Sequence, residues 1–477
     1  MLRIFSLLVV LAGTTAEAAE KPNFIYFLID DLGYSDVGFH GSQIKTPHID
    51  SLANGGAKLE AFYVQPVCSP TRAAFMTGRY PMRHGLQVGV VRPWAEYGLP
   101  LAERTLAQSL QESGYFTAIC GKWHLGHFQR AYLPTSRGFN HQYGHYNGAL
   151  DCFTHMRDGG FDWHRNDQVC RDEGYSTTLL GDEVVRLIEH SSSERPFFIY
   201  VPFNAPHTPL QAPQEYIDRY ANIADQKRRL YAAMVACIDD QIGRIVAALE
   251  KRGIRNNTLL AFSSDNGGPT GSGATNGSLR AGKATLYEGG VRVSAFANWP
   301  GQINAGTVVS EPLHIVDWYP TLLGLAGAKV EQGLPLDGKD AWPTISAGKP
   351  SPHDDILLNT TPANGAVRAG NWKLIINGGL ADDGSEQAAG KVAADGNNQP
   401  GKGKQAKGKK GKGKALASSV ELFDLSTDPG ERTNLAEQHP DKVRELRARL
   451  AKYQSQAVPP KSSPAAPGFK APAVWGE

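Results

Sequence analysis

A cysteine at the start of a predicted helix is the residue of this chain that most clearly indicates a chemical function. Cys68 is followed by Ser69, Pro70, Thr71 and Arg72. Serine is a favoured helix cap and proline suits the first helical position, so the segment predicts a helix that begins just after Cys68. Because the N-terminal end of a helix carries partial positive charge, the thiol is expected at a site suited to an anion.

Two pairs of oxygen-bearing side chains follow apolar runs elsewhere in the chain. One pair is Asp30 with Asp31, and the other is Asp265 with Asn266. Hard oxygen ligands without sulfur or imidazole suit Ca²⁺ better than a transition metal. An aspartate pair after a strand can also be a turn or a helix cap, but the second pair at an equivalent position favours a metal site.

The fold class follows from alternating strand and helix patterns. Four short apolar runs predict buried strands, at residues 24–29, 115–120, 197–201 and 259–262. Helical periodicity lies between them, which indicates an α/β parallel sheet. Ligands of such sheets bind outside the carboxyl ends of the strands, so His124 and His207 are expected to join the acidic pairs there. Each histidine alone could equally be a hydrogen-bonded structural residue.

Two longer motifs resemble those of type I sulfatases, which belong to the alkaline phosphatase superfamily. Residues 66–78 are similar to the first family signature, in which the cysteine of Cys-x-Pro-x-Arg is oxidised to formylglycine. Residues 114–124 are similar to the second signature and depart from it at Cys120. The resemblance extends from about Lys21 to the closing helix and implies a large, mostly parallel sheet flanked by helices, with a smaller C-terminal antiparallel sheet and helix. The alternative for Cys68 is an ordinary buried cysteine.

The resemblance implies a function for each matching residue. The implied ligands of one Ca²⁺ are the modified Cys68 with Asp30, Asp31, Asp265 and Asn266. The implied catalytic residues are Cys68, Arg72, Lys122, His124, His207 and Lys283. Arg72 and Lys122 would hold the formylglycine, and His207 with Lys283 would contact the sulfate and the leaving oxygen. For Lys283, in a glycine-rich stretch, the alternative is a solvated loop lysine.

The implied chemistry is covalent catalysis in two steps. One hydroxyl of the hydrated aldehyde attacks sulfur with Asp265 as the base, and His207 or Lys283 protonates the departing alcohol. His124 then removes the proton of the second hydroxyl, which expels sulfate from the covalent ester and regenerates the aldehyde. A maturation enzyme that generates formylglycine is an implied partner.

Further segments narrow the resemblance to the arylsulfatase B branch, the N-acetylgalactosamine-4-sulfatases. They are residues 132–139, 286–292 and 314–321. The implied substrate is a sulfated carbohydrate of the N-acetylgalactosamine 4-sulfate type. However, Gly277 occupies a position where that branch has tryptophan, so the substrate could instead be another sulfated glycan. Two rival hypotheses are a phosphodiester or phosphonate monoester hydrolase on the same scaffold and a non-catalytic sulfoglycan-binding protein. The intact catalytic set argues against a pure binder.

Composition and segment patterns suggest an exported, multidomain protein. With 477 residues and 41% hydrophobic content, the chain can bury a large core. Residues 1–18 resemble a secretion signal, which predicts a periplasmic or extracellular protein, and no later apolar run is long enough to span a membrane. A catalytic domain is expected at 19–345, a C-terminal α+β subdomain at 346–458 and a disordered tail at 459–477.

The subdomain contains an insertion, 378–418, that is rich in lysine and glycine. Its seven lysines between 401 and 414 exceed the formal net charge of +2, so the remaining chain is mildly acidic and a nucleic-acid partner is not supported. The insertion is expected to be disordered. A solvated linker is the favoured interpretation, and a tether for an acidic polysaccharide is the alternative.

The chain has five cysteines, some of which could form disulfide bonds in an exported protein. An odd number leaves one uncommitted, and Cys68 fills that place. Cys152 and Cys170 flank a polar segment and are predicted to form a disulfide, whereas Cys120 and Cys237 are expected to be buried small hydrophobes. The oligomeric state is left open.

Overall fold

The computed structural model describes residues 21–330, 333–379, 419–462 and 464–477. The expected secretion signal and residues 380–418 of the predicted insertion lie outside these ranges. Among the described residues, no helix combines the length and the apolar character that crossing a membrane requires.

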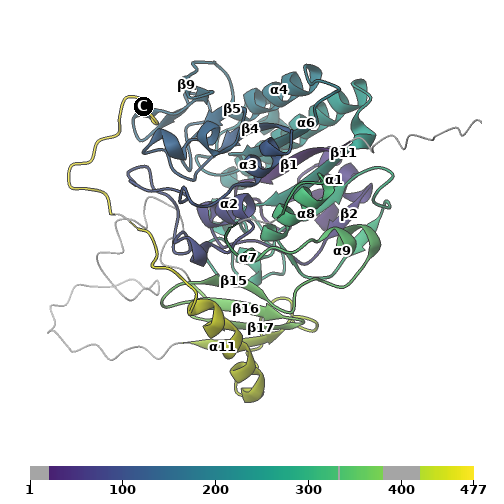
Figure 1. The fold of residues 1–477 in the computed structure, drawn as a ribbon, viewed down its shortest axis with the longest axis vertical. Helices are drawn as coiled ribbons and strands as arrows, with labels where there is room; N and C mark the ends of the chain where they lie inside the picture. The colour runs from purple at the N-terminus through teal and green to yellow at the C-terminus, as the bar shows by residue number, and fades with distance from the viewer. Residues whose placement is uncertain (1–20, 331–332, 380–418, 463) are drawn as a thin grey trace, which may run out of the picture.

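A central sheet of ten strands forms the larger part of the protein (Figure 1). Its order is β13 (Thr307–Val309), β2 (Ala57–Leu59), β12 (Ala295–Asn298), β11 (Thr258–Ser264), β1 (Asn23–Ile29), β10 (Phe197–Phe203), β4 (Phe116–Lys122), β5 (His141–His145), β8 (His164–Arg165) and β9 (Gln168–Val169). The five strands from β11 to β5 are parallel, whereas β12 and β8 run antiparallel to their inner neighbours. The predicted α/β fold class is confirmed.

Helices cover both faces of this sheet. They are α1 (Pro47–Asn54), α2 (Cys68–Thr77), α3 (Leu106–Glu112), α4 (Ser176–Glu189), α5 (Gln214–Asp218), α6 (Gln226–Lys251), α7 (Glu288–Val291), α8 (Trp318–Leu325) and α9 (Trp342–Ala347). Shorter 3-10 turns are η1 (Gly38–His40), η2 (Pro81–Arg83), η3 (Arg130–Tyr132), η4 (Pro134–Arg137), η5 (Arg255–Asn257), η6 (Thr270–Ser272) and η7 (Ile315–Asp317). Two small two-stranded sheets pair β3 (Phe62–Tyr63) with β14 (Leu313–His314) and β6 (Met156–Arg157) with β7 (Gly160–Phe161).

Strand β1 shows why the central strands appear as continuous apolar runs. All seven of its residues are buried. Phe24, Tyr26 and Leu28 belong to the hydrophobic cluster that includes α2, α3 and α8. Their neighbours Ile25, Phe27 and Ile29 belong to the cluster that includes α4 and α6. A strand buried on both faces needs apolar side chains at every position.

A second, smaller sheet lies below the central one in Figure 1. It is antiparallel, in the order β15 (Ile356–Thr360), β16 (Gly365–Ala369), β17 (Trp372–Ile376) and β18 (Val420–Asp424). One face packs against α11 (Pro440–Gln454) through Leu446 and Leu450. The other face joins Tyr63 and Leu286 of the part built on the central sheet in a separate cluster.

A buried lysine joins the two parts of the protein. Lys373 in β17 lies 2.8 Å from Glu288 at the start of α7 and 2.8 Å from Glu431. Burial opposes ionisation of both glutamates, and Lys373 offsets it enough to lower the pKa of Glu288. One ammonium therefore balances carboxylates from both sides of the interface.

The C-terminal tail differs from the expectation of disorder. Backbone N–H groups of Val458 and Lys461 donate to the carbonyls of Met82 at 2.9 Å and Gly85 at 2.7 Å. Trp475 is only 2% exposed. The proline-rich composition predicts a solvated segment, but hydrogen bonds to Met82 and Gly85 and one anchoring indole hold the tail in place.

The predicted disulfide between Cys152 and Cys170 is wrong, because all five cysteines are free. Cys152 is buried, and its Sγ accepts from Asn204 Nδ2 at 3.8 Å, whereas half-buried Cys170 lies beside Asp172. The short spacing did not reveal that the two thiols have separate surroundings. Cys120 and Cys237 are buried as expected.

We expect Lys373→Met to destabilise the protein by about 3 to 5 kcal/mol, because it removes the buried cation that Glu288 and Glu431 share. Denaturant or thermal unfolding measures the change. Lys442→Met is the matched control, since Lys442 forms an exposed helical pair with Glu445 and such pairs contribute about 0.5 kcal/mol or less. Equal effects of the two substitutions would contradict the assigned importance of the buried lysine.

Candidate active site

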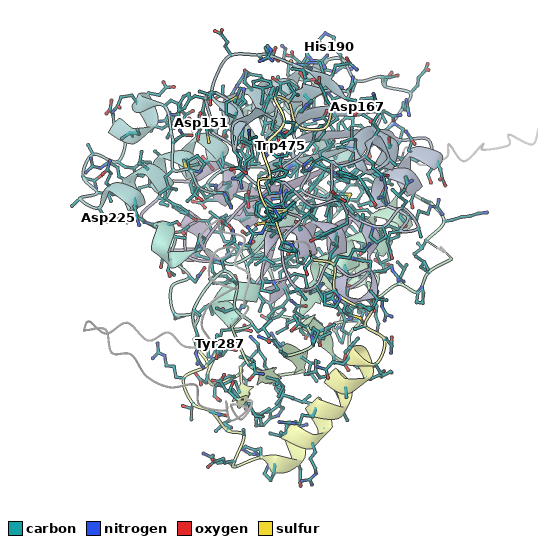
Figure 2. All side chains as sticks on the ribbon, turned by 90° about the vertical axis from the view of Figure 1, so that its left-hand side faces the viewer. Asp151, Asp167, His190, Asp225, Tyr287 and Trp475 are labelled. Atoms are coloured by element: carbon teal, nitrogen blue, oxygen red, sulfur yellow. The ribbon has the colours of Figure 1, made fainter. Side chains whose placement is uncertain are left out.

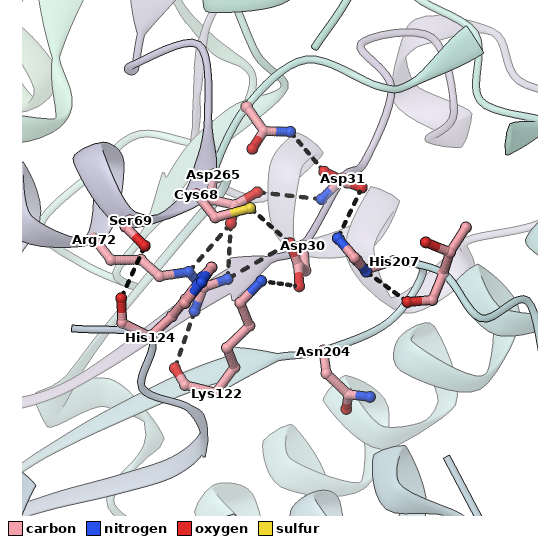
Figure 3. A network of polar contacts seen from close by, with 12 residues as sticks. Asp30, Asp31, Cys68, Ser69, Arg72, Lys122, His124, Asn204, His207 and Asp265 are labelled. Carbon is pink, nitrogen blue, oxygen red and sulfur yellow. Dashed lines mark hydrogen bonds and ion pairs between the residues drawn. The ribbon is translucent and has the colours of Figure 1, made fainter. Parts of the chain in front are cut away.

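The residues singled out in the sequence meet at one edge of the central sheet, beside the first turn of α2 (Figure 3). Asp30 and Asp31 follow β1, and Asp265 with Asn266 follows β11. Because β11, β1, β10 and β4 are parallel, their carboxyl ends lie on the same edge. The structure thus brings together residues that lie far apart in the sequence.

Cys68 is the first residue of α2 and is almost completely buried. Its thiol lies 3.7 Å from Asp30 Oδ1. Burial raises the pKa of the Cys68 thiol to about 12, although Lys122 and Lys283 act in the opposite direction. Because the thiolate is the nucleophilic form of cysteine, unmodified Cys68 is poorly suited to attack a substrate.

Two cations hold the carboxylates on the Cys68 side of the site. Arg72 donates to Asp265 Oδ2 from Nη2 at 2.7 Å and from Nε at 3.2 Å. Its Nη1 donates to the Lys122 carbonyl at 3.0 Å, and Lys122 Nζ lies 2.7 Å from Asp30 Oδ2. Burial, opposed by Lys122, raises the pKa of Asp30. All four side chains are fully buried, so each charge depends on its partners.

Asp31 connects the residues of the other half. Asn266 Nδ2 donates to Asp31 Oδ1 at 2.7 Å, and Lys283 Nζ lies 2.8 Å from the same oxygen. His207 Nε2 lies 3.6 Å from Oδ2. Burial opposes ionisation of Asp31, but Lys283 and His207 hold its pKa below the usual range. Asp31 has a φ of 68°, and such strain persists where surrounding contacts enforce it.

His124 is held in one orientation by its backbone surroundings. Its Nε2 lies 3.1 Å from the Val91 carbonyl, so Nε2 carries the hydrogen and Nδ1 is the acceptor. Nδ1 has no hydrogen-bond partner within the described part of the chain. Burial lowers the pKa of His124 most, and the positive charges of Lys122 and Arg72 lower it further, so it lies well below its ordinary value. A Cβ at Gly148 would lie 2.5 Å from the His124 ring, so any other residue there would displace the ring.

Ser69 differs from its expected function as a helix cap. The N-cap residue is Val67, and Ser69 is the second residue of α2. The Ser69 hydroxyl donates to the His124 carbonyl at 2.9 Å and accepts from the Val91 N–H at 3.0 Å. Because the helix begins earlier than expected, this hydroxyl joins the Cys68 helix to the His124 loop.

Two supporting residues were missed in the sequence. Ser264 Oγ donates to the Asn266 carbonyl at 2.7 Å. Asn276 Nδ2 donates to the Ala281 carbonyl at 3.0 Å and so orders the loop that carries Lys283. Neither residue belongs to a motif that predicts catalysis or metal binding, so only the folded structure reveals their contacts.

The oxygen donors fit a calcium ion. Potential ligand atoms of Asp30, Asp31, Cys68 and His207 lie within 4.8 Å of one another. Asp265 adjoins them, because its Oδ1 accepts the Asp31 N–H at 3.2 Å. The Oδ1 of Asn266 is buried and lacks a hydrogen-bond partner among the described residues. Buried carboxylate and amide oxygens are ligands that Ca²⁺ prefers.

Comparisons with known proteins agree on one family. The sulfatase family model matches residues 22–328. Arylsulfatase J of Mus musculus is 38% identical over an alignment of 501 positions, which covers 98% of this chain and 81% of that protein. The N-acetylgalactosamine-6-sulfatase of Mus musculus is 33% identical over 360 positions, which cover 70% of this chain and 68% of that protein.

Solved structures share the fold. The crystal structure of Ps i-CgsB in complex with k-i-k-neocarrahexaose aligns with a TM-score of 0.80 at 32% identity, covering 93% of this chain and 95% of that one. The phosphonate monoester hydrolase of Agrobacterium radiobacter aligns with a TM-score of 0.63 at 19% identity, covering 92% and 96%. At that identity the second likeness shows the fold alone.

We expect calcium to stabilise this site. After chelation and dialysis, Ca²⁺ at about one hundred times its dissociation constant should raise the free energy of unfolding by about 2.7 kcal/mol. Asn266→Leu should remove most of this gain, because it replaces the unpartnered amide oxygen with an apolar group of similar size. Calorimetric unfolding with and without Ca²⁺ measures the difference.

Asp240→Asn is the matched control for calcium. Asp240 belongs to a second acidic group, with His48 and Asp239, away from the Cys68 site. This variant should keep the full response to Ca²⁺. A response lost in Asp240→Asn and kept in Asn266→Leu would place the ion at the second group.

Proposed function

This chain belongs to the sulfatase family, and we propose that it removes sulfate from a sulfated glycan by means of a formylglycine made from Cys68. Hydrolysis of sulfuric esters is the activity of that family. The observation that carries the proposal is the position of Cys68, which starts a helix beside Asp30 and the cations Arg72 and Lys122. A protonated thiol has little use there, whereas its oxidised form would face a site suited to an anion.

A calcium ion and a formylglycine would complete this site. Asp30, Asp31, Asp265 and Asn266 would hold Ca²⁺ together with residue 68. When bound, the ion supplies positive charge that stabilises the developing charge on the sulfate oxygens. When formed and hydrated by one water molecule, formylglycine would supply one hydroxyl for attack on sulfur and a second hydroxyl whose deprotonation releases sulfate.

Buried cations define the inner side of the proposed sulfate pocket. Arg72 and Lys122 are completely buried and reach residue 68 from its own helix and from the end of β4. They would orient the attacking oxygen and stabilise its charge. Asp265, which accepts two hydrogen bonds from Arg72, is the base that we assign to this oxygen.

Partly accessible residues define the outer side. The side chains of Lys283 and His207 are 7% and 13% exposed, and both contact Asp31. They therefore lie where the sugar alcohol would leave, and we assign them its protonation. His124 offers Nδ1 as a proton acceptor, and we assign it the proton whose removal releases sulfate.

The proposed substrate is a sulfated galactosamine-type sugar, with N-acetylgalactosamine 4-sulfate as the first compound to test. Relatives named for N-acetylgalactosamine sulfate and a structural neighbour in complex with a neocarrahexaose support a sugar substrate. Gly277 has a φ of 64°, and a Cβ there would lie 2.2 Å from Ser35 Oγ. A tryptophan cannot occupy this position without a backbone shift, which supports a sugar pocket shaped differently from that of the arylsulfatase B branch.

The proposed enzyme would be exported and would need its formylglycine to be formed by another enzyme. Residues 1–18, which lie outside the described ranges, would direct the protein to the periplasm or the cell exterior. A formylglycine-generating enzyme would act on the segment around Cys68 before folding, because the folded side chain is buried.

Cys68→Ala is expected to lower turnover of an aryl sulfate by about 10³-fold or more, because the attacking oxygen is lost. Mass spectrometry of active protein should show that residue 68 has lost its sulfur. Cys120→Ala is the matched control, since it alters a buried cysteine without a catalytic assignment and should keep wild-type turnover. Active protein with an intact Cys68 thiol would refute the formylglycine mechanism.

The substrate class is tested separately. Aryl sulfate, aryl phosphonate, a phosphodiester and a panel of sulfated galactosamine sugars are compared by kcat/KM. Sulfate esters are expected to be the best substrates, and a much larger rate on phosphorus would favour the phosphonate monoester hydrolase hypothesis.

A further inference from the structure

An aromatic row lies beside the loop of His124 and consists of the rings of His127, Trp475, Phe469 and Trp94. The rings of His127 and Trp475 meet edge-on, with centroids 5.4 Å apart. Trp475 and Phe469 are stacked, with centroids 6.3 Å apart and ring planes at 23°. Phe469 meets Trp94 at 64°, with centroids 6.2 Å apart. The row therefore joins the C-terminal tail to two loops of the part built on the central sheet.

Both ends of the aromatic row are tied to the candidate active site. His127 follows His124 by three residues, and its Nε2 donates to the Pro93 carbonyl at 3.1 Å, directly before Trp94. Trp94 follows Val91 by three residues, and the Val91 carbonyl accepts from His124 Nε2 at 3.1 Å. Three residues span about 11 Å at most. An oligosaccharide held at the candidate site can therefore reach the row.

The tail segment that carries Phe469 is fixed on both sides of this residue. Before it, backbone hydrogen bonds join residues 458–461 to residues 82–85. After it, the Trp475 N–H donates to the Phe161 carbonyl at 2.9 Å. In Figure 1 the yellow tail passes from α11 up to this region, and Trp475 lies on the face shown in Figure 2. Because the segment is held in advance, a ligand of Phe469 would lose little affinity to ordering it.

Phe469 is the member of the row that faces solvent. It is 39% exposed, whereas its stacking neighbour Trp475 is 2% exposed. Residues 459–476 contain two lysines, Lys461 and Lys470, and no acidic residue, and both lysines are exposed. An aromatic face offers an apolar surface to the C–H groups of a sugar ring, and neighbouring lysines attract the sulfates of the same polymer. These features favour a sulfated glycan over an apolar protein partner.

We propose that Phe469 and Trp94 form a subsite that binds a sugar ring next to the sulfated sugar of the substrate. This inference rests on the proposed function. One face of the sugar would pack on the Phe469 ring, and Trp94 would form the side wall of the subsite. Continuity with the loop of His124 makes the occupant a further unit of the glycan that is held at the candidate active site. The subsite would therefore favour oligosaccharides over a single sulfated sugar.

The first test compares a chondroitin 4-sulfate tetrasaccharide with the monosaccharide N-acetylgalactosamine 4-sulfate, which lacks the neighbouring sugars. Phe469→Ala should lower the ratio of kcat/KM for the tetrasaccharide to that for the monosaccharide by about 10-fold, mainly through KM, because an aromatic contact is lost. Phe469→Tyr should keep the ratio, since tyrosine presents the same ring. An unchanged ratio in Phe469→Ala would overturn the inference.

Trp94→Leu tests the second ring of the subsite. Leucine keeps an apolar side chain but removes the aromatic wall beside Phe469. We expect a fall in the same ratio, smaller than for Phe469→Ala, because Trp94 contributes the side of the subsite. An equal loss of kcat on both saccharides would show that Trp94 only supports the loop of His124 and would overturn its function in the subsite.

Phe153→Ala is the matched control. Phe153 is likewise an exposed aromatic residue, at 45%, but its ring packs on Tyr175 with centroids 5.2 Å apart, outside the aromatic row. This variant should keep the wild-type ratio of the two saccharides. A loss equal to that of Phe469→Ala would indicate a general effect of exposed aromatic surface and would overturn a specific subsite.

A binding measurement separates this inference from the proposed reaction. In the Cys68→Ala background, calorimetry records the affinity for the two saccharides independently of turnover. The tetrasaccharide should bind about 10-fold more tightly than the monosaccharide, and adding Phe469→Ala should remove this difference. Equal affinities, or a difference that persists in Phe469→Ala, would refute the subsite even if sulfate hydrolysis is confirmed. A difference that Phe469→Ala removes, without any hydrolysis by the wild-type protein, would refute the proposed reaction alone.

Discussion

The candidate active site depends on the burial of three aspartates at one edge of the sheet. Asp30, Asp31 and Asp265 are at most 2% exposed. A buried carboxylate costs several kcal/mol unless a cation or hydrogen-bond donors compensate it. The compensating cations are Arg72, Lys122 and Lys283. Three negative and three positive side chains therefore form one balanced cluster, and position 68 lies against it.

Strand ends alone do not build this cluster, because loops must turn sharply to aim their side chains. Asp31 and His124 both occupy the left-handed region, with φ values of 68° and 59°. The close packing of Gly148 and the hydroxyl of Ser69 hold the His124 loop, while Asn266 and Lys283 hold Asp31. Strain at a functional site is thus maintained by contacts from several elements.

Much of the fold was predictable because the central strands are buried on both faces. Residues 24–29 and 259–262 are apolar at every position or nearly so, and the polar pairs after them mark the ends of parallel strands. The short strands β12 and β2, which pair antiparallel with each other near one edge of the sheet, had no such signal. Nor did Ser264 or Asn276, because a single polar residue can serve in a turn as well as in a site.

The sequence by itself determined the α/β class and singled out Cys68, the acidic pairs and the buried cations as the candidate site, because local spacing and apolar runs encode them. Only the tertiary structure decided that Cys152 and Cys170 remain apart and that Ser69 binds the His124 loop. It also decided that the indole of Trp475 donates a hydrogen bond to the carbonyl of Arg157 in β6. These contacts join segments distant in the chain, and their free energy arises only when packing removes both partners from water.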